Sequence, residues 1–113
     1  EESVTIWGTG TPIREWLYVE DGVKSLVKAT HLAEGNYFFN IGVNKGISIK
    51  ELAIKIAELL DWGGNFEYDL SRPDGAPEKR VDGSSSLKYL KWEPETSLED
   101  GLIKTIEWYS NER

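Results

Sequence analysis

The sequence contains no cysteine and only one histidine, His31. Without thiols the chain has no disulfide framework and no thiolate metal site. No other potential ligand shares metal-binding spacing with His31, so we expect no metal site and interpret His31 as a structural or exposed residue near the end of a helix. The apolar runs are too short for a signal peptide or a membrane span, which predicts a cytoplasmic protein with no membrane partner.

Basic residues are also scarce, because 13 lysines and arginines stand against 20 acids and leave a net charge of −7. Nucleic-acid binding depends on cations that neutralise the phosphate backbone, so we expect no nucleic-acid partner. A small anion remains a candidate ligand, since salt screens distant acids over about 8–10 Å and a local pair of cations can dominate a cleft. The 113 residues predict one domain, residues 1–113, with a single core.

The first half of the chain has the apolar pattern of three strands and a helix. Residues 4–7 are expected to form a strand, and residues 16–19 its partner in a hairpin. A helix is expected over 20–32, with the apolar side chains at positions 23, 26 and 27 buried at helical spacing. The nearly continuous apolar run 37–43 is typical of a strand covered on both faces.

The second half is expected to form three helices and a strand. These elements cover residues 48–61, 66–69, 84–90 and 96–109. Ser48 with Glu51, and Thr96 with Glu99, form capping boxes at the start of the first and last of these helices. The whole pattern predicts an α+β fold, with a small mixed sheet and hairpin and three to four helices.

The first candidate site lies between Trp7 and Arg14. A Gly-Thr-Gly turn followed by Pro12 leaves a strand and presents Arg14. A guanidinium offers a planar fork of donors that suits two phosphate oxygens, and the indole of Trp7 can stack on a base or sugar. The alternative is that Arg14 pairs with Glu15 or a helix acid and that Trp7 belongs to the core.

The second candidate site is the loop over residues 70–80. It concentrates Arg72, Lys79 and Arg80 in a segment that two prolines stiffen and that turns at Asp74. A basic loop that is ordered in advance loses little entropy when it binds a phosphate. The alternative is a solvated turn whose cations pair with neighbouring acids.

Residues 7–21 read W-G-T-G-T-P-I-R-E-W-L-Y-V-E-D. This stretch resembles the start of the carboxy-terminal substrate domain in the extended short-chain dehydrogenase/reductases, the NAD-dependent epimerase/dehydratase family. It is most similar to the GDP-L-fucose synthases, whose usual form is W-G-(S/T)-G-x-P-x-R-E-F. Further matches follow in the family's order at Asn40-Ile41-Gly42, Ser48 to Ala53, Tyr68-Asp69, Arg72 to Pro77, Trp92-Glu93-Pro94 and Ser97 to Gly101.

The resemblance implies that the chain is the substrate-binding lobe of a nucleotide-sugar epimerase/reductase. Such enzymes act on GDP-4-keto-6-deoxymannose, epimerise the carbons that flank the ketone, and reduce the ketone with NADP(H), or with NAD(H) in relatives. The implied partners are a nucleotide-diphosphate sugar and the amino-terminal Rossmann domain of the same protein. The full-length enzyme is expected to be a homodimer.

Two features of a complete family enzyme are absent from the sequence. The turn Gly8-Thr9-Gly10 lacks the third glycine and the following helix of a dinucleotide-binding turn. None of the five tyrosines has a lysine four positions later, the pair that transfers protons in this family. The resemblance therefore implies that the catalytic and cofactor-binding residues lie outside this chain, in an amino-terminal NAD(P)-binding domain, and that the fragment alone is inactive.

The resemblance also assigns residues to the substrate site. The positions that match substrate-binding positions of the family are Trp7, Arg14, Arg72, Asp74 and Lys79. On this pattern Trp7 contacts the substrate, Arg14 binds a phosphate, and the other three reach the nucleotide from the second loop.

Several positions depart from the fucose synthase pattern. Asn65 stands where some members have an arginine, Glu78 replaces a basic residue, and Lys91 replaces a glycine. The first two changes remove positive charge, which leaves the base and the sugar open. The alternatives are the substrate lobe of another nucleotide-sugar epimerase/dehydratase, a stand-alone nucleotide-sugar-binding module, or an interaction domain that recruits another chain through the edge at 37–43.

Overall fold

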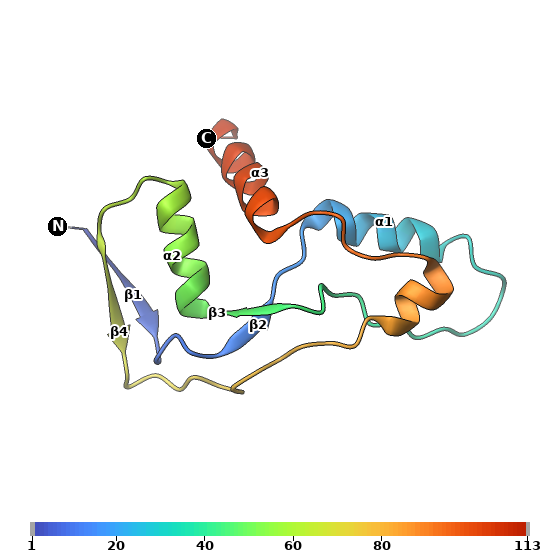
Figure 1. The fold of residues 1–113 in the computed structure, drawn as a ribbon, viewed down its shortest axis with the longest axis horizontal. Coiled ribbons are helices and arrows are strands. Elements are labelled where there is room, and N and C mark those ends of the chain that lie inside the picture. The colour runs from blue at the N-terminus through green and yellow to red at the C-terminus, as the bar shows by residue number, and fades with distance from the viewer. Residues whose placement is uncertain (1, 113) are drawn as a thin grey trace. The chain divides into compact units, whose positions relative to one another are not determined.

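The computed structural model describes residues 2–112 and confirms an α+β fold (Figure 1). The chain divides into two compact units. The first comprises the described residues up to Arg14 together with Gly46–Lys79, and the second comprises Glu15–Lys45 together with the residues from Arg80 onward. Each unit is therefore built from two segments that are far apart in the sequence. No helix in the described part of the chain is long and apolar enough to cross a bilayer.

The first unit contains two pairs of strands and one helix. β1 (Ser3–Trp7) lies parallel to β4 (Asn65–Asp69), residue against residue along their whole length, and Figure 1 shows them side by side. β2 (Ile13–Glu15) pairs with β3 (Gly46–Ser48) in an antiparallel arrangement, and α2 (Ile49–Leu59) follows β3 directly. Parallel strands need a long crossover, and the segment that contains α2 is part of that crossover.

The predicted hairpin between residues 4–7 and 16–19 is wrong. β1 pairs with β4 instead, and residues 16–18 are not a strand. Alternating apolar residues identify a strand but do not identify its neighbour. Ile6 on β1 and Leu52 on α2 are both buried, so β1 contributes one side chain to the core of this unit.

The start of α2 confirms the predicted capping box. The Ser48 hydroxyl accepts a hydrogen bond from the Glu51 amide at 3.1 Å, and the Glu51 carboxylate accepts one from the Ser48 amide at 2.9 Å. These bonds lower the pKa of Glu51, with the backbone amide of Ser48 as the largest cause. The amides of Ser48 and Glu51, which have no acceptor within the helix, thus bond to side chains three residues away. The spacing of these two residues in the sequence was therefore enough to locate the start of α2.

The second unit contains three helices, as predicted. They are α1 (Val19–Ala29), the single π-helical turn η1 (Ser86–Leu90) and α3 (Leu98–Asn111), and α1 packs beside η1 (Figure 1). The cap of α3 lies one residue later than predicted, because the hydroxyl of Ser97, and not of Thr96, accepts from the Asp100 amide at 3.1 Å. Both residues have a suitable hydroxyl, so composition did not separate them.

The predicted apolar core face of α1 is wrong. Val23, Leu26 and Val27 are 51%, 68% and 53% exposed, whereas Asp21 and Ser25 are buried. The helical spacing of the apolar residues is real, but nothing in the described chain covers that face. The helix therefore presents an apolar stripe to the exterior of its own unit.

The predicted strand over residues 37–43 is also wrong. The structure gives this segment no strand pairing, and Phe38 is 93% exposed. A strand needs a neighbour for its backbone hydrogen bonds, and the described residues supply none here.

Candidate functional site

The first candidate segment leaves β1 through a tight turn that depends on two glycines. Gly8 and Gly10 have φ angles of 77° and 74°, in the left-handed region that favours glycine. A side chain at Gly8 would also collide with the carboxylate of Asp74. The turn therefore brings the chain after Trp7 directly against the basic loop.

Backbone hydrogen bonds join β2 to the basic loop. The amide of Ile13 donates to the carbonyl of Pro77 at 2.9 Å, and the amide of Lys79 donates to the carbonyl of Ile13 at 3.0 Å. Arg14 follows at once and is half-buried, with its Nη1 donating to the Ile13 carbonyl at 2.7 Å. Its Nη2 lies 3.7 Å from the position that a Cβ on Gly75 would take, so the guanidinium lies beside the turn of the loop.

Trp7 and Arg72 form a second contact between the two segments. The Arg72 guanidinium carbon lies 4.7 Å from the centre of the Trp7 ring, a cation–π distance. Arg72 Nε also lies 3.5 Å from a carboxylate oxygen of Asp69 at the end of β4. Hydrogen bonds from Ser71 lower the pKa of Asp69, its hydroxyl being the largest cause. These contacts restrain the side chain of Arg72 against Trp7, which is itself 68% exposed.

Asp74 is held by the turn rather than directed away from it. Its two carboxylate oxygens accept hydrogen bonds from the amide and the hydroxyl of Thr9, at 2.7 and 2.8 Å. These bonds lower the pKa of Asp74 below its ordinary value of 3.8, with the Thr9 amide as the largest cause. Thr9 was not among the residues singled out from sequence, although a short polar residue in a glycine turn is a common partner for backbone and side-chain oxygens.

The structure therefore brings all five predicted positions onto two facing segments of the first unit. These positions are Trp7, Arg14, Arg72, Asp74 and Lys79. The loop over 71–80 is exposed throughout, so its cations are accessible to a ligand. Asp69 and Asp74 already accept hydrogen bonds within these segments, so both carboxylates are engaged by neighbouring donors.

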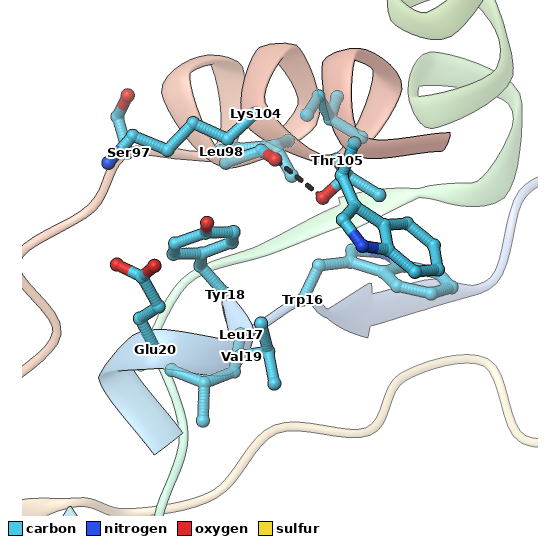
Figure 2. A pocket seen from close by; sticks show the side chains of 12 residues that line it. Trp16, Leu17, Tyr18, Val19, Glu20, Ser97, Leu98, Lys104 and Thr105 are labelled. Atoms are coloured by element: carbon cyan, nitrogen blue, oxygen red, sulfur yellow. Dashed lines mark hydrogen bonds between the residues drawn. The ribbon is translucent and has the colours of Figure 1, made fainter. Parts of the chain in front are cut away.

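A separate apolar groove lies in the second unit, between residues 16–20 and α3 (Figure 2). Its volume is about 640 Å³, and its walls are mostly aromatic and aliphatic side chains, including Trp16, Tyr18 and Trp108. Lys104 Nζ lies 5.3 Å from the centre of the Tyr18 ring, and the Thr105 hydroxyl donates to the Gly101 carbonyl at 2.7 Å. None of the residues predicted to bind substrate lines this groove.

His31 makes a local contact only. Its Nδ1 lies 2.8 Å from the carbonyl of Val27, one turn earlier in the chain. Among the described residues, no three histidine, cysteine, aspartate or glutamate side chains gather in a group that could hold a metal ion.

Comparisons with known proteins identify relatives of this chain. The model of the NAD dependent epimerase/dehydratase family matches residues 1–42. GDP-L-fucose synthase 1 of Arabidopsis thaliana is 41% identical over 108 residues, which is 96% of this chain and 33% of that protein. GDP-L-fucose synthase of Escherichia coli strain K12 is 36% identical, over 94% of this chain and 36% of its own length.

A solved structure shares the fold. UDP-glucose 4-epimerase of Thermotoga maritima, solved with UDP-glucose, superposes with a TM-score of 0.86 at 28% identity, over 98% of this chain and 36% of that one. The chain thus spans about a third of the length of the relatives that it matches. Over nearly its whole length, it is homologous to one portion of the GDP-L-fucose synthases, within the NAD-dependent epimerase/dehydratase family.

Proposed function

We propose that this chain is the carboxy-terminal, substrate-binding domain of a nucleotide-sugar epimerase/reductase of the GDP-L-fucose synthase type. On this proposal the turn after β1 and the basic loop bind the diphosphate of a GDP-sugar such as GDP-4-keto-6-deoxymannose. Arg14, Arg72 and Lys79 supply the positive charge.

The observation that supports this site best is the backbone pairing of Ile13 with Pro77 and Lys79. It brings Arg14 beside the turn at Gly75, in the loop that also carries Arg72 and Lys79. A diphosphate has enough oxygens to engage more than one cation, and charge-assisted bonds are the stronger ones. Two curated relatives are named GDP-L-fucose synthases, and the Thermotoga structure is described with UDP-glucose, which agrees with a nucleotide-sugar ligand.

The residues of this chain do not fit a dinucleotide cofactor. In a dinucleotide-binding turn, the pyrophosphate meets the start of a helix. Here Gly8-Thr9-Gly10 connects β1 to β2, and the side of the turn at Gly8 is closed by Asp74. We therefore assign NADP(H) or NAD(H), and the tyrosine and lysine that transfer protons, to a Rossmann domain in the remainder of a longer protein. The fragment alone is then expected to be inactive.

The apolar surfaces of the second unit support a covering domain. The stripe on α1, the unpaired segment 37–43 and the groove beside α3 all expose apolar side chains. Soluble proteins seldom leave such area open without a partner. Because the relatives are about three times as long as this chain, we propose that their additional portion, the nucleotide-binding domain, covers these surfaces.

Ligand binding is the direct test. The ¹⁵N-labelled chain is titrated with GDP, GDP-mannose, UDP and inorganic phosphate while amide shifts are followed. We expect GDP to shift the amides of residues 8–14 and 72–79. Arg14→Ala should weaken GDP binding about ten- to a hundred-fold, because one charge-assisted bond to phosphate is worth roughly 1.5–3 kcal/mol.

The matched control is Lys55→Ala, which removes one positive charge from α2 and should leave GDP affinity within about twofold. Equal losses in the two variants would indicate general charge attraction. Absence of shifts at both segments under a large excess of GDP would contradict the proposed site. Stronger binding of UDP than of GDP would favour another nucleotide-sugar enzyme, in agreement with the loss of basic residues at Asn65 and Glu78.

The reading frame that encodes this chain tests the domain assignment. An upstream in-frame strand, glycine-rich turn and helix, with a tyrosine followed four positions later by a lysine, is expected. A stop codon and a start codon immediately upstream would instead favour a stand-alone nucleotide-sugar-binding module.

A further inference from the structure

Thr9 and Asp74 form the most specific side-chain contact between the turn and the basic loop. The pair is separated by 65 residues in the sequence, yet the aspartate accepts two hydrogen bonds from the threonine, at 2.7 and 2.8 Å. Both oxygens of the carboxylate are used, one by the amide and one by the hydroxyl. A bidentate contact of this kind restrains direction as well as distance.

Two neighbours of Thr9, Gly8 and Thr11, favour its contact with Asp74. The Thr9 hydroxyl also lies 2.7 Å from the hydroxyl of Thr11, which orients it. Any side chain at Gly8 would collide with the Asp74 carboxylate, so the left-handed glycine is required by the contact as well as by the turn. Thr9 lowers the pKa of Asp74, so the carboxylate is ionised at neutral pH.

Polar contacts, rather than buried apolar ones, hold the basic loop. Its residues 71–80 are all exposed, so buried apolar contacts contribute little to its order. The second half is tied to β2 through Pro77 and Lys79. The first half, residues 72–76, is tied by the stack of Arg72 on Trp7, by the backbone and side-chain contacts of Arg72 with Asp69, and by the Thr9–Asp74 contact.

We propose that Asp74 is a positioning residue, and that the Thr9–Asp74 contact is a latch that orders residues 72–76 before a ligand arrives. The latch keeps Arg72 on Trp7 and keeps the turn at Gly75 beside Arg14. Asp74 thus acts through the cations and does not itself contact the ligand. The effect on affinity rests on the proposed function, whereas the effect on loop order does not.

The ligand-free test measures the heteronuclear ¹⁵N NOE of the chain. In Asp74→Ala, the NOE values of residues 72–76 should fall by about half, while those of 77–79, still bonded to Ile13, remain as in the original chain. Asp74→Asn keeps an acceptor for the Thr9 amide and should lie between the two. Asp82→Ala is the matched control, because the Asp82 carboxylate also accepts a hydrogen bond from a backbone amide, that of Ser84 at 2.9 Å, but lies outside residues 72–79. Unchanged NOE values at 72–76 in Asp74→Ala would overturn the latch.

The binding test uses GDP and a double-mutant cycle. Asp74→Ala should raise the Kd for GDP about five- to twentyfold, because the loop must then be ordered during binding. Thr9→Val should have a smaller effect alone and almost none in the Asp74→Ala background, since the two side chains act as one unit. The ratio of the GDP and UDP affinities should not change.

The outcomes separate this inference from the proposed function. Additive effects of the two substitutions would show that Thr9 and Asp74 act independently, and a changed GDP/UDP ratio would show that Asp74 contacts the ligand directly. Either result would overturn the positioning role alone. If the original chain does not bind GDP, the proposed function fails, and the NOE measurement still decides whether the latch exists.

Discussion

At the scale of single residues, Asp21 makes contacts in the structure that its position in the sequence did not predict. It lies in the first turn of α1, where an acid favours the helix dipole, yet its side chain is only 1% exposed. Its carboxylate accepts hydrogen bonds from the amides of Glu95 and Thr96, at 3.2 and 2.9 Å. Its carbonyl accepts from the indole of Trp92 at 2.9 Å. One residue therefore fixes the segment that leads into α3.

Replacement of Asp21 tests this role. Asp21→Ala should lower the free energy of unfolding by about 2–3 kcal/mol, because two backbone donors lose their acceptor. Asp21→Asn keeps an oxygen in the same place and should lose less than about half of that amount. Urea denaturation followed by tryptophan fluorescence measures both. Equal losses in the two variants would indicate that the negative charge, and not the acceptor, is what the segment requires.

Individual residue types at the candidate site were predictable, but their roles were less so. Arg14 and the loop cations could be chosen because phosphate recognition needs donors with positive charge. That Asp74 would bond to Thr9 was not evident, since a contact across 65 residues leaves no local spacing pattern. The binding roles of these residues therefore stay predictions, while the structure adds that the Asp74 carboxylate is engaged by Thr9.

At the scale of elements, the ends of helices were predicted better than the pairing of strands, because a helix end depends on residues that are close in the sequence. The capping box of α2 was located correctly, because its four atoms belong to residues three apart. The partner of β1 was not, because it depends on β4 more than fifty residues later. The strand over 37–43 failed for a related reason, since a strand forms only where a neighbour is present.

The end of η1 provides a test at this scale. Lys91 has a φ of 54° and a ψ of 36°, in the left-handed region that favours glycine. Its carbonyl accepts a hydrogen bond from Lys28 Nζ at 2.7 Å, a contact that any residue here can keep. Lys91→Gly should therefore raise the free energy of unfolding by about 0.5–1 kcal/mol, because it relieves the left-handed strain at some cost in chain entropy.

Lys88→Gly is the control within the same element. Lys88 lies inside η1, where glycine adds freedom to the unfolded chain and removes the exposed contact of Lys88 Nζ with the Tyr89 ring at 5.1 Å, so this substitution should destabilise by about 0.5–1 kcal/mol. Thermal melts of both variants under identical conditions show the sign directly. A lower melting temperature for Lys91→Gly would contradict the strain argument.

At the scale of the whole molecule, the second unit differs from a typical isolated domain. Leu26 and Phe38 are large, apolar and mostly exposed, and the groove beside α3 adds aromatic surface. The charge of −7 opposes association, but salt screens it over about 8–10 Å while apolar burial is largely unaffected. If a nucleotide-binding domain covers these surfaces in a longer protein, the isolated chain should self-associate through them.

Sedimentation of the isolated chain tests that expectation. The weight-average mass of the original chain should rise across a concentration series at physiological salt. Leu26→Ser combined with Phe38→Ser should weaken association at least about tenfold, because burial of one large apolar side chain is worth roughly 1.5–3 kcal/mol. Leu70→Ser is the matched control, since Leu70 is equally exposed but belongs to the first unit. A chain that stays monomeric at high concentration would show that the exposed apolar residues of the second unit do not require a cover. It would contradict the proposed covering domain independently of any result with GDP.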